Sequence, residues 1–432
     1  MTLEEYKMKS VYEDFIIAHA DDDTSKLLLG RQKWPNIDID MAVTAIDCRK
    51  KIRTKLPEWY SETGIIYPDR ICAEQSSSSF TSRYKAEVAS RIIGTERCGT
   101  CRIADLTGGL GVDSLAFSHI AETVLYNEMN AGRATAARHN FGLLSSGNIR
   151  VESFCVRASG EDSSCFWEML KEFAPDLIYM DPARRTLTGN KVFLIEDCSP
   201  DVLTLLPDLF TCCRNVLIKL SPMADISMLN KRFSEHGAVV REIHVVASGG
   251  ECKELLLWLT EGENGECRIV VNENGHVLSI DKDMRMEAPL LLPDISYLGK
   301  MRYLFEPGKA LSKAGMFNVL CNFFGIKLYK AGISTHLYFL PEIVDKTSLD
   351  RLKCFGKLFS ILEVTELDKH SIRDYGKRYQ KAEVTARNIR MTSEELRKRM
   401  GASSGGSAHI FGLNIETDCV SDNYIIAGKR LV

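Results

Sequence analysis

The sequence predicts an α/β protein whose central sheet is mostly parallel and ends in an antiparallel hairpin. Short apolar runs alternate with helical segments between residues 103 and 220, which is typical of parallel strands joined by helices. A glycine-dense turn at 108–111 follows the first run and leads into a predicted helix starting at Val112. Two apolar runs, 239–247 and 254–260, flank a polar turn and predict the hairpin.

Five apolar runs predict the parallel strands, and acidic residues follow the first four. The runs are residues 103–105, 123–126, 149–155, 177–180 and 216–220. The acids at or after their ends are Asp105, Glu128, Asp162 and Asp181. Because ligands bind parallel sheets beyond the carboxyl ends of the strands, we expect these acids to gather around one ligand.

The sequence of the glycine turn distinguishes between two classes of ligand, dinucleotides and ligands with a cationic amino group. Dinucleotides need a G-x-G-x-x-G turn, but Ser114 stands where the third glycine would be. Asp105 precedes the turn, where an acid suits a ligand with a cationic amino group, such as S-adenosylmethionine (AdoMet). Glu128 would hold the ribose hydroxyls, and Asp162 in the polar turn 159–162 would meet the adenine. The alternative is a glycine-rich turn that binds no ligand.

These residues make the chain resemble the class I AdoMet-dependent methyltransferases. Residues 105–111 match the first motif of that family, Glu128 matches its ribose acid, and 181–184 (D-P-A-R) look like its fourth motif. The terminal hairpin is also typical of the family and is absent from dinucleotide dehydrogenases. The resemblance covers residues 90–262. It implies a Rossmann-like sheet with AdoMet as cofactor, held in the turn by Thr107, Gly109 and Gly111.

The chain is similar in particular to the methyltransferases that carry a THUMP-like C-terminal domain. That similarity adds residues 74–77 (E-Q-S-S), Tyr84-Lys85 and the tail around 381–388. It implies that the serine-rich segment 73–80 closes over the cofactor, with Gln75 and Thr81 near the methionine carboxylate. The alternative for this segment is a flexible linker.

The fourth motif indicates how an acceptor could be held. The Asp181 carboxylate and the Pro182 carbonyl can accept the hydrogens of an exocyclic amine and direct its lone pair at a methyl group. Arg184 replaces the aromatic residue that stacks on the base in relatives, which leaves the acceptor atom open. With Arg185 it could bind a phosphate. Both arginines could instead pair with Glu196 and Asp197.

Composition and chain order predict four parts. At 432 residues the chain should hold two to four domains of roughly 100–200 residues each. We expect a helical cap and linker (1–90), an AdoMet-binding domain (91–262), a small α+β domain (263–345) and a basic THUMP-like domain (346–432). The family resemblance implies that the third is ferredoxin-like. Within these parts we expect a helix at 40–48 capped by Asp38 or Asp40, and a helix at 81–93. We also expect a short strand within 65–72, a helical stretch at 310–324, a loop at 402–407 and an edge strand at 424–432.

The last part concentrates positive charge. Between residues 369 and 399 lysines and arginines outnumber acids, whereas the whole chain carries a net charge of −3. We expect Lys377, Arg378, Lys381 and Arg387 to bind RNA phosphates, with Tyr375 and Tyr379 stacking on bases. The alternative is a solvated helix face.

Composition also bounds the compartment and the cofactors. No apolar run approaches the ~18 residues of a membrane span, and the start lacks the regions of a signal peptide. We therefore expect a cytoplasmic protein that does not bind membranes and has reduced cysteines. Cys98 and Cys101 form a C-x-x-C without a second pair, so we expect no metal site. No covalent role is assigned to Cys198.

The sequence favours one function over two others. The first is an AdoMet-dependent methyltransferase acting on a base of tRNA or rRNA. The second is a methyltransferase acting on a protein or small molecule, against which the basic span argues. The third is a noncatalytic RNA-binding protein that retains AdoMet, against which the intact Asp181-Pro182 argues.

Overall fold

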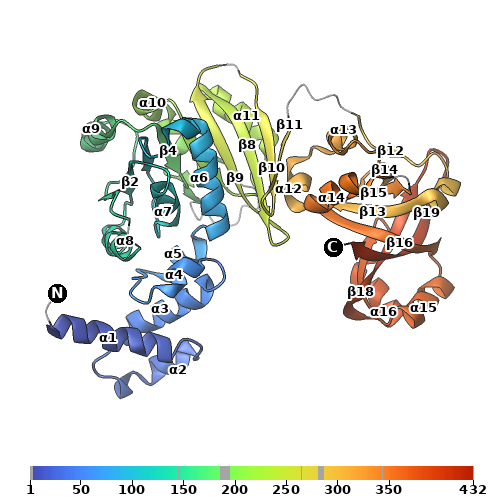
Figure 1. Ribbon diagram of the computed structural model, residues 1–432, viewed down its shortest axis with the longest axis horizontal. Coiled ribbons are helices and arrows are strands. Elements are labelled where there is room, and N and C mark those ends of the chain that lie inside the picture. Colours follow the sequence, from blue (N-terminus) through green and yellow to red (C-terminus); the bar gives the residue numbers. More distant parts are fainter. Residues whose placement is uncertain are drawn as a thin grey trace. The chain divides into compact units, whose positions relative to one another are not determined.

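The computed structural model describes residues 3–144, 146–184, 195–263, 265–280, 287–342 and 344–431 (Figure 1). The chain divides into two compact units. Unit 1 is Met1–Ile243 with Leu255–Cys267, and unit 2 is His244–Glu254 with Arg268–Val432. Two long strands, β8 (Ala238–Ser248) and β9 (Glu251–Glu261), are therefore divided between the units. The finer division into four domains remains a prediction.

The sheet of unit 1 confirms the predicted α/β fold. Its strands lie in the order β3, β2, β1, β4, β7, β9, β8. Strand β1 pairs in parallel with β2 and β4, β4 pairs in parallel with β7, and β9 runs antiparallel to β7. The parallel strands are β1 (Arg102–Asp105), β2 (Thr123–Asn127), β3 (Ile149–Glu152), β4 (Leu177–Met180) and β7 (Val216–Leu220).

The third strand is shorter than the predicted 149–155. It ends at Glu152, and beyond this point the backbone of Phe154 forms hydrogen bonds with the Asn127 side chain and not with a neighbouring strand. The Phe154 amide donates to Asn127 Oδ1 at 2.8 Å, and Asn127 Nδ2 donates back to the Phe154 carbonyl at 3.1 Å. A side-chain amide that satisfies both backbone groups removes the need for a longer strand.

Helices connect the strands of unit 1, and their apolar positions explain why they form. In α9, Phe166, Leu170 and Phe173 recur at helical spacing and are all buried. Helix α6 (Ser79–Ile93) precedes β1, and the helices between the strands are α7 (Val112–Ser118), α8 (Ala131–Leu143), α9 (Ser164–Phe173), α10 (Val202–Cys212) and α11 (Ile226–Glu235).

Residues 3–75 are mostly helical, and their core, in which Ile46 and Trp59 are buried, also includes Leu110 and Val112. Asp38 caps α3 by accepting from the Met41 amide at 3.0 Å, as one of the two predicted caps. The predicted strand within 65–72 is wrong, because Asp69 accepts from the Cys72 amide and starts a helix instead. The helices are α1 (Leu3–Ala18), α2 (Thr24–Leu29), α3 (Ile39–Ile52), α4 (Pro57–Ser61) and α5 (Arg70–Gln75).

Unit 2 contains a sheet in the order β12, β14, β15, β13, β16, β19, β18, β17. Its strands are β12 (Leu290–Leu291), β13 (Met301–Pro307), β14 (Tyr329–Gly332), β15 (Thr335–Pro341), β16 (Gly356–Glu366), β17 (Lys381–Arg387), β18 (Ser403–Glu416) and β19 (Ser421–Leu431). Strand β10 (Arg268–Glu273) pairs antiparallel with β11 (His276–Ile280), and both belong to the nine-stranded sheet that contains β8 and β9. The helices are α12 (Lys309–Ala314), α13 (Leu320–Phe324), α14 (Lys346–Cys354), α15 (Lys369–Arg378) and α16 (Ser393–Met400).

Three local predictions for unit 2 are wrong. The expected helical stretch 310–324 breaks at Gly315, which adopts a left-handed φ of 68° and ends α12. The expected loop 402–407 is largely part of β18, where residues 404–407 bulge because Lys381 pairs with Ser403 and Ala382 with Ala408. The expected edge strand is β19, which lies between β16 and β18 and buries Ile425 and Ile426.

Within the residues that the structure describes, no helix combines the length and the apolar character that a membrane span requires.

Candidate active site

A cavity of about 700 Å³ lies in unit 1 beyond the carboxyl ends of β1, β2 and β4. Its volume is in the ordinary range for small-molecule and cofactor sites. The glycine turn, the segments after β2 and β3, and the end of α5 all contribute to it. The lining residues include Gln75, Ser77, Thr107, Gly109, Gly111, Asp113, Glu128, Phe154, Asp181 and Ser199.

Backbone hydrogen bonds fix the glycine turn between the neighbouring strands. The Leu106 amide donates to the Tyr179 carbonyl at 3.0 Å, and the Gly108 amide donates to the Asn127 carbonyl at 2.8 Å. A Cβ on Gly108 would lie 2.1 Å from the Tyr126 ring, so only glycine fits there. Gly109 has a φ of +55°, and a Cβ there would meet nothing closer than 4.0 Å. The turn is therefore packed on one side and open on the other, as a ligand cradle requires.

Asp105 is buried behind the turn at 1 % exposure and is not among the described residues that line the cavity. Its Oδ2 accepts from Ser114 Oγ at 2.5 Å, and its Oδ1 accepts from the Thr107 amide at 3.1 Å. Burial raises the pKa of Asp105 to about 7. Asp105 therefore holds the shape of the turn and can change its protonation state near neutral pH.

Glu128 lines the cavity and is held by backbone donors on both oxygens. Oε2 accepts from the Gly109 amide at 3.0 Å, and Oε1 accepts from the Asn130 amide at 2.9 Å. Glu128 is only 7 % exposed. Its carboxylate is thus fixed at the end of β2 next to the glycine turn, where the sequence predicted the ribose acid.

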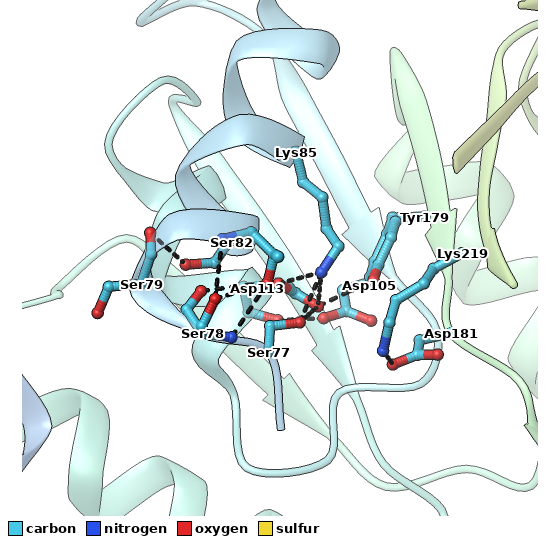
Figure 2. A network of polar contacts seen from close by, with 12 residues as sticks. Ser77, Ser78, Ser79, Ser82, Lys85, Asp105, Asp113, Tyr179, Asp181 and Lys219 are labelled. Atoms are coloured by element: carbon cyan, nitrogen blue, oxygen red, sulfur yellow. Dashed lines mark hydrogen bonds and ion pairs between the residues drawn. The ribbon is translucent and has the colours of Figure 1, made fainter. Parts of the chain in front are cut away.

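A buried network joins α6 to the start of α7 (Figure 2). Lys85 Nζ lies 3.0 Å from Asp113 Oδ1 and donates to Ser77 Oγ at 2.5 Å. Ser77 Oγ and the Tyr179 hydroxyl each donate to Asp113 Oδ2 at 2.8 Å. Burial acts to raise the pKa of Asp113, but the ammonium groups of Lys85 and Lys219 and the hydroxyl of Ser77 outweigh it and hold the pKa below its usual range.

Asp181 stands at the cavity wall and is held at two points. Its amide donates to Thr107 Oγ1 at 2.6 Å, which ties the fourth motif to the glycine turn. Its Oδ2 accepts from Lys219 Nζ at 2.5 Å. Pro182 follows as a buried residue.

The segment after Asp181 starts a short hairpin. Its strands are β5 (Ala183–Arg184) and β6 (Cys198–Ser199), in which Ala183 pairs with Ser199. The side chain of Arg184 and the whole of Arg185 lie outside the described residues. Glu196, a predicted ion-pair partner of these arginines, lies 2.8 Å from Arg232.

The structure brings together most, but not all, of the predicted cofactor residues. Thr107, Gly109, Gly111, Glu128 and Gln75 line the cavity. Three others are not among the described lining residues: Asp105 lies behind the turn, Thr81 is buried in the capping box of α6, where it exchanges hydrogen bonds with Ser78, and Asp162 is exposed. Phe154, which had no predicted role, lines the cavity after β3.

The sequence singled out none of the polar side chains at 113, 179 and 219 for a role. Ser77 and Lys85 were noted only within the family similarity. Three features of the sequence could have pointed to these residues: Lys85 lies inside a helix, Asp113 lies in the first turn of another helix, and Lys219 lies inside an apolar strand.

The predicted RNA-binding residues lie on α15 and β17 in unit 2. Arg378 lies 2.6 Å from Glu363 and 2.6 Å from Asp374, and Arg387 lies 3.4 Å from Glu306. Lys377 and Lys381 are exposed. Acids thus already neutralise both arginines.

The two tyrosines beside these cations differ in exposure. The expectation that Tyr375 stacks on a base is wrong, because its ring is 1 % exposed and its hydroxyl donates to the Ile425 carbonyl at 3.2 Å. Tyr379 is half-buried and donates to Glu363 Oε1 at 2.6 Å.

Comparison with known proteins agrees with this architecture. Residues 356–419 match the family described as THUMP domain-like, and residues 303–346 match a ferredoxin-like domain family. A solved structure of a candidate methyltransferase from Porphyromonas gingivalis W83 is similar over 100% of both chains, with 28% sequence identity and a TM-score of 0.78.

Two further solved structures are similar over part of the chain. One is a candidate RNA methyltransferase from Pyrococcus horikoshii, with 17% identity over 41% of this chain and 85% of that chain at a TM-score of 0.28. The other is a SAM-dependent methyltransferase from Aquifex aeolicus, with 12% identity over 45% of this chain and 99% of that chain at a TM-score of 0.31. Both TM-scores are low, so neither similarity supports a conclusion about this chain. No curated protein matches the chain.

The predicted sheet with its terminal hairpin is present, the similarity to the Porphyromonas gingivalis structure runs over the full length, and the C-terminal part matches a THUMP-like family. By its fold and by these similarities, the chain resembles the class I methyltransferases that carry a THUMP-like C-terminal domain.

Proposed function

We propose that the protein is an AdoMet-dependent methyltransferase that acts on RNA, with a base of tRNA or rRNA as the acceptor. The main support for the proposal is that the glycine turn, Glu128 and Asp181 all line the same cavity. A cofactor bound between the first two would have its reactive end near the third.

The residues present fit AdoMet. The open side of Gly109 leaves room for a ligand against the backbone, and Glu128 offers a fixed carboxylate for two ribose hydroxyls. Gln75 would lie along the methionine part, while Asp105 would shape the turn from behind. When bound, AdoMet supplies the methyl group for an in-line transfer.

The remaining chemistry falls to Asp181 and Pro182. A carboxylate and a carbonyl can each accept one hydrogen of an amino group, which orients the nitrogen lone pair toward the cofactor. Thr107 fixes the Asp181 backbone and Lys219 fixes its carboxylate, so the acceptor would meet a preorganised site. Arg184 remains the proposed contact for a phosphate of the substrate.

The C-terminal part supports RNA as the substrate class. A match to THUMP-like domains, together with the exposed Lys377 and Lys381, favours contact with a phosphate backbone. We assign residues 346–432 to this contact and residues 91–262 to catalysis. A protein or small-molecule acceptor is the second candidate, and it is favoured by the neutralisation of Arg378 and Arg387.

Two measurements test the proposal. Calorimetry should detect AdoMet binding and no NAD binding. Labelled AdoMet should transfer its methyl group to RNA from a strain that lacks the gene, and not to RNA from the parent strain, whose sites are already modified. Mass spectrometry of the nucleosides then identifies the product. AdoMet binding with transfer to protein extract and none to RNA would favour the second candidate.

A further inference from the structure

Lys219 is an unusual residue for its place in the fold. Strand β7 reads V-L-I-K-L, and its four other residues are buried apolar side chains. A lysine in such a strand is costly unless its ammonium group reaches a partner or water. The Lys219 side chain is 16 % exposed, and it contacts the Asp181 carboxylate, whose side chain is 32 % exposed.

The register of the sheet sets this contact. Strand β7 runs parallel to β4, with Tyr179 beside Leu217 and Met180 beside Ile218. Lys219 and Asp181 come next on their two strands, so the pairing brings them side by side at the cavity. Figure 2 shows the Lys219 side chain reaching one oxygen of Asp181, close to Asp105 and Tyr179.

The Lys219 ammonium also offsets the negative charge of the carboxyl groups around Asp181. Charged and titratable groups of the described residues near this carboxylate include Asp105 on β1, Asp113 and Lys85 in the buried network, Tyr179 on β4 and Lys219 on β7. The negative charge of Asp181 contributes to the raised pKa of Asp105 after burial and Asp113, and Lys219 helps to lower the pKa of Asp113. Three carboxyl groups therefore lie close together, and Lys219 is the cation that contacts Asp181.

We propose that Lys219 is a positioning residue for methyl transfer: its ammonium group fixes one oxygen of Asp181, so that the carboxylate meets the acceptor in one orientation. This inference rests on the proposed function. A carboxylate on a single Cα–Cβ–Cγ stem otherwise rotates, and it would be driven away from Asp105 and Asp113 by like charge. Lys219 touches neither reacting group, and it acts through Asp181.

Kinetics of Lys219→Met test the proposal. Methionine keeps the length and apolar stem of lysine but loses the charge. We expect kcat to fall by about 10- to 100-fold, the cost of a misplaced catalytic contact, with the KM for RNA and AdoMet affinity little changed. Lys219→Arg should recover most of the loss, because it restores a cation at the same point. Lys231→Met is the matched control, since Lys231 is an exposed lysine 3.9 Å from Glu235 on α11.

A double-mutant cycle separates positioning from a general effect on the fold. If Lys219 acts through Asp181, then Lys219→Met should cost little more once Asp181→Asn is present. Additive losses would show that Lys219 works independently of Asp181 and would overturn the proposal. So would unchanged kcat in Lys219→Met.

A crystal structure of the Lys219→Met protein gives a readout that needs no substrate. The Asp181 side chain should leave its present orientation, whereas its backbone should remain bound to Thr107. If the carboxylate stays in place, Lys219 does not position it. If the unaltered protein methylates no RNA, the substrate proposal fails, but this structural comparison still decides the role of Lys219. Should Lys219→Met fail to fold, as judged by AdoMet binding and melting, Lys219→Gln takes its place in all three arms.

Discussion

Lys85 Nζ lies 3.0 Å from Asp113 Oδ1, and the lysine has no exposed surface. The two residues come from different helices: Lys85 lies on α6, and Asp113 lies in the first turn of α7 directly after the glycine turn. Through Ser77, the same ammonium also holds the segment between α5 and α6 at the cavity wall. One ion pair thus ties the glycine turn to the N-terminal helices.

Removing one partner of this pair should destabilise the protein severely. Lys85→Met leaves the Asp113 charge buried with only hydroxyl donors, and breaking a buried pair in this way costs about 3–5 kcal/mol. The free energy of unfolding, measured in urea at pH 7, should fall by that order.

The matched control is Lys51→Met, which removes a lysine whose ion pair with Glu74 is exposed. Its effect on unfolding should be small, since exposed pairs contribute little. Equal effects of the two substitutions would show that the Lys85 pair has no special role in stability.

Asp105 should make stability depend on pH in the direction opposite to most carboxylates. Burial raises its pKa from 3.8 to about 7, so between these values the folded protein holds a proton that the unfolded chain has lost. The contribution of Asp105 is therefore fully present below pH 3.8 and is lost as the pH rises to about 7. The slope is at most about 1.4 kcal/mol per pH unit for one proton.

Asp105→Asn tests this dependence, because an amide can accept from Thr107 and donate to Ser114 without titrating. The stability difference between the variant and the unaltered protein should shift in favour of the variant as the pH rises through this window. Asp176→Asn, a substitution at a partly exposed carboxylate, should show no such shift in its favour. Parallel pH curves for Asp105→Asn and the unaltered protein would show that Asp105 does not titrate in the window.

Gly109→Val should abolish AdoMet binding and leave the fold in place. A Cβ at this position projects into open space beside the cavity, so it would occupy the ligand and not the core. The positive φ adds strain of about 1–3 kcal/mol, which melting experiments should register as a modest loss. Calorimetry with AdoMet and NAD is the measurement.

Gly147→Val is a suitable control for Gly109→Val, since that glycine also has nothing within 4 Å of its Cβ but lies away from the cavity. AdoMet binding by Gly109→Val at unaltered affinity would place the cofactor elsewhere. NAD binding without AdoMet binding would reverse the assignment of the ligand.

Asp181→Ala should suppress turnover while AdoMet binding remains. The carboxylate contacts the acceptor in the proposed mechanism, and losing such a contact lowers the chemical step more than the affinity for the cofactor. We expect a loss of about 100-fold or more in kcat. The measurement is methyl transfer from labelled AdoMet under single-turnover conditions, with Asp201→Ala at the same cavity as control. Near-normal turnover would remove Asp181 from the mechanism.

Local signals predicted the catalytic sheet well. Strand β4 is an uninterrupted apolar run, and β7 is an apolar run broken only by Lys219, so the positions of both strands could be read from the sequence. The glycine turn and Glu128 were found because the ligand geometry demands particular residues at particular places. Asp105 was found for the same reason, although it lies behind the turn and not on the cavity surface.

Long-range contacts could not be predicted in this way. Lys85 and Asp113 are 28 residues apart, and nothing in either helix marks the other as its partner. The position of β19 was misjudged because an apolar strand near a chain end reads the same at an edge as in the middle of a sheet. The local contacts of Thr81 could not be predicted either, because its hydroxyl takes part in the N-terminal cap of α6.

The exposed lysines of the C-terminal span should supply more RNA affinity than its arginines. Arg378 faces Glu363 and Asp374, and Arg387 faces Glu306, so a phosphate would have to displace a carboxylate to reach either. Lys377 and Lys381 are exposed and can meet phosphates directly. Replacing all four residues by alanine should abolish most of the RNA binding. Replacing the two lysines and the two arginines separately distinguishes the contribution of each pair to the RNA affinity.

The salt dependence of binding counts the contacts that each pair makes. Each phosphate contact contributes about 0.7 to the slope of log affinity against log salt for single-stranded RNA. Lys377→Ala with Lys381→Ala should therefore lower the slope by about 1.4, whereas Arg378→Ala with Arg387→Ala should lower it by much less. Fluorescence anisotropy with labelled RNA between about 50 mM and 200 mM salt measures both. AdoMet affinity, measured in parallel, should not change in either pair. If both pairs bind RNA as the unaltered protein does at every salt concentration, the span is a solvated face, and a protein or small-molecule acceptor becomes the better assignment.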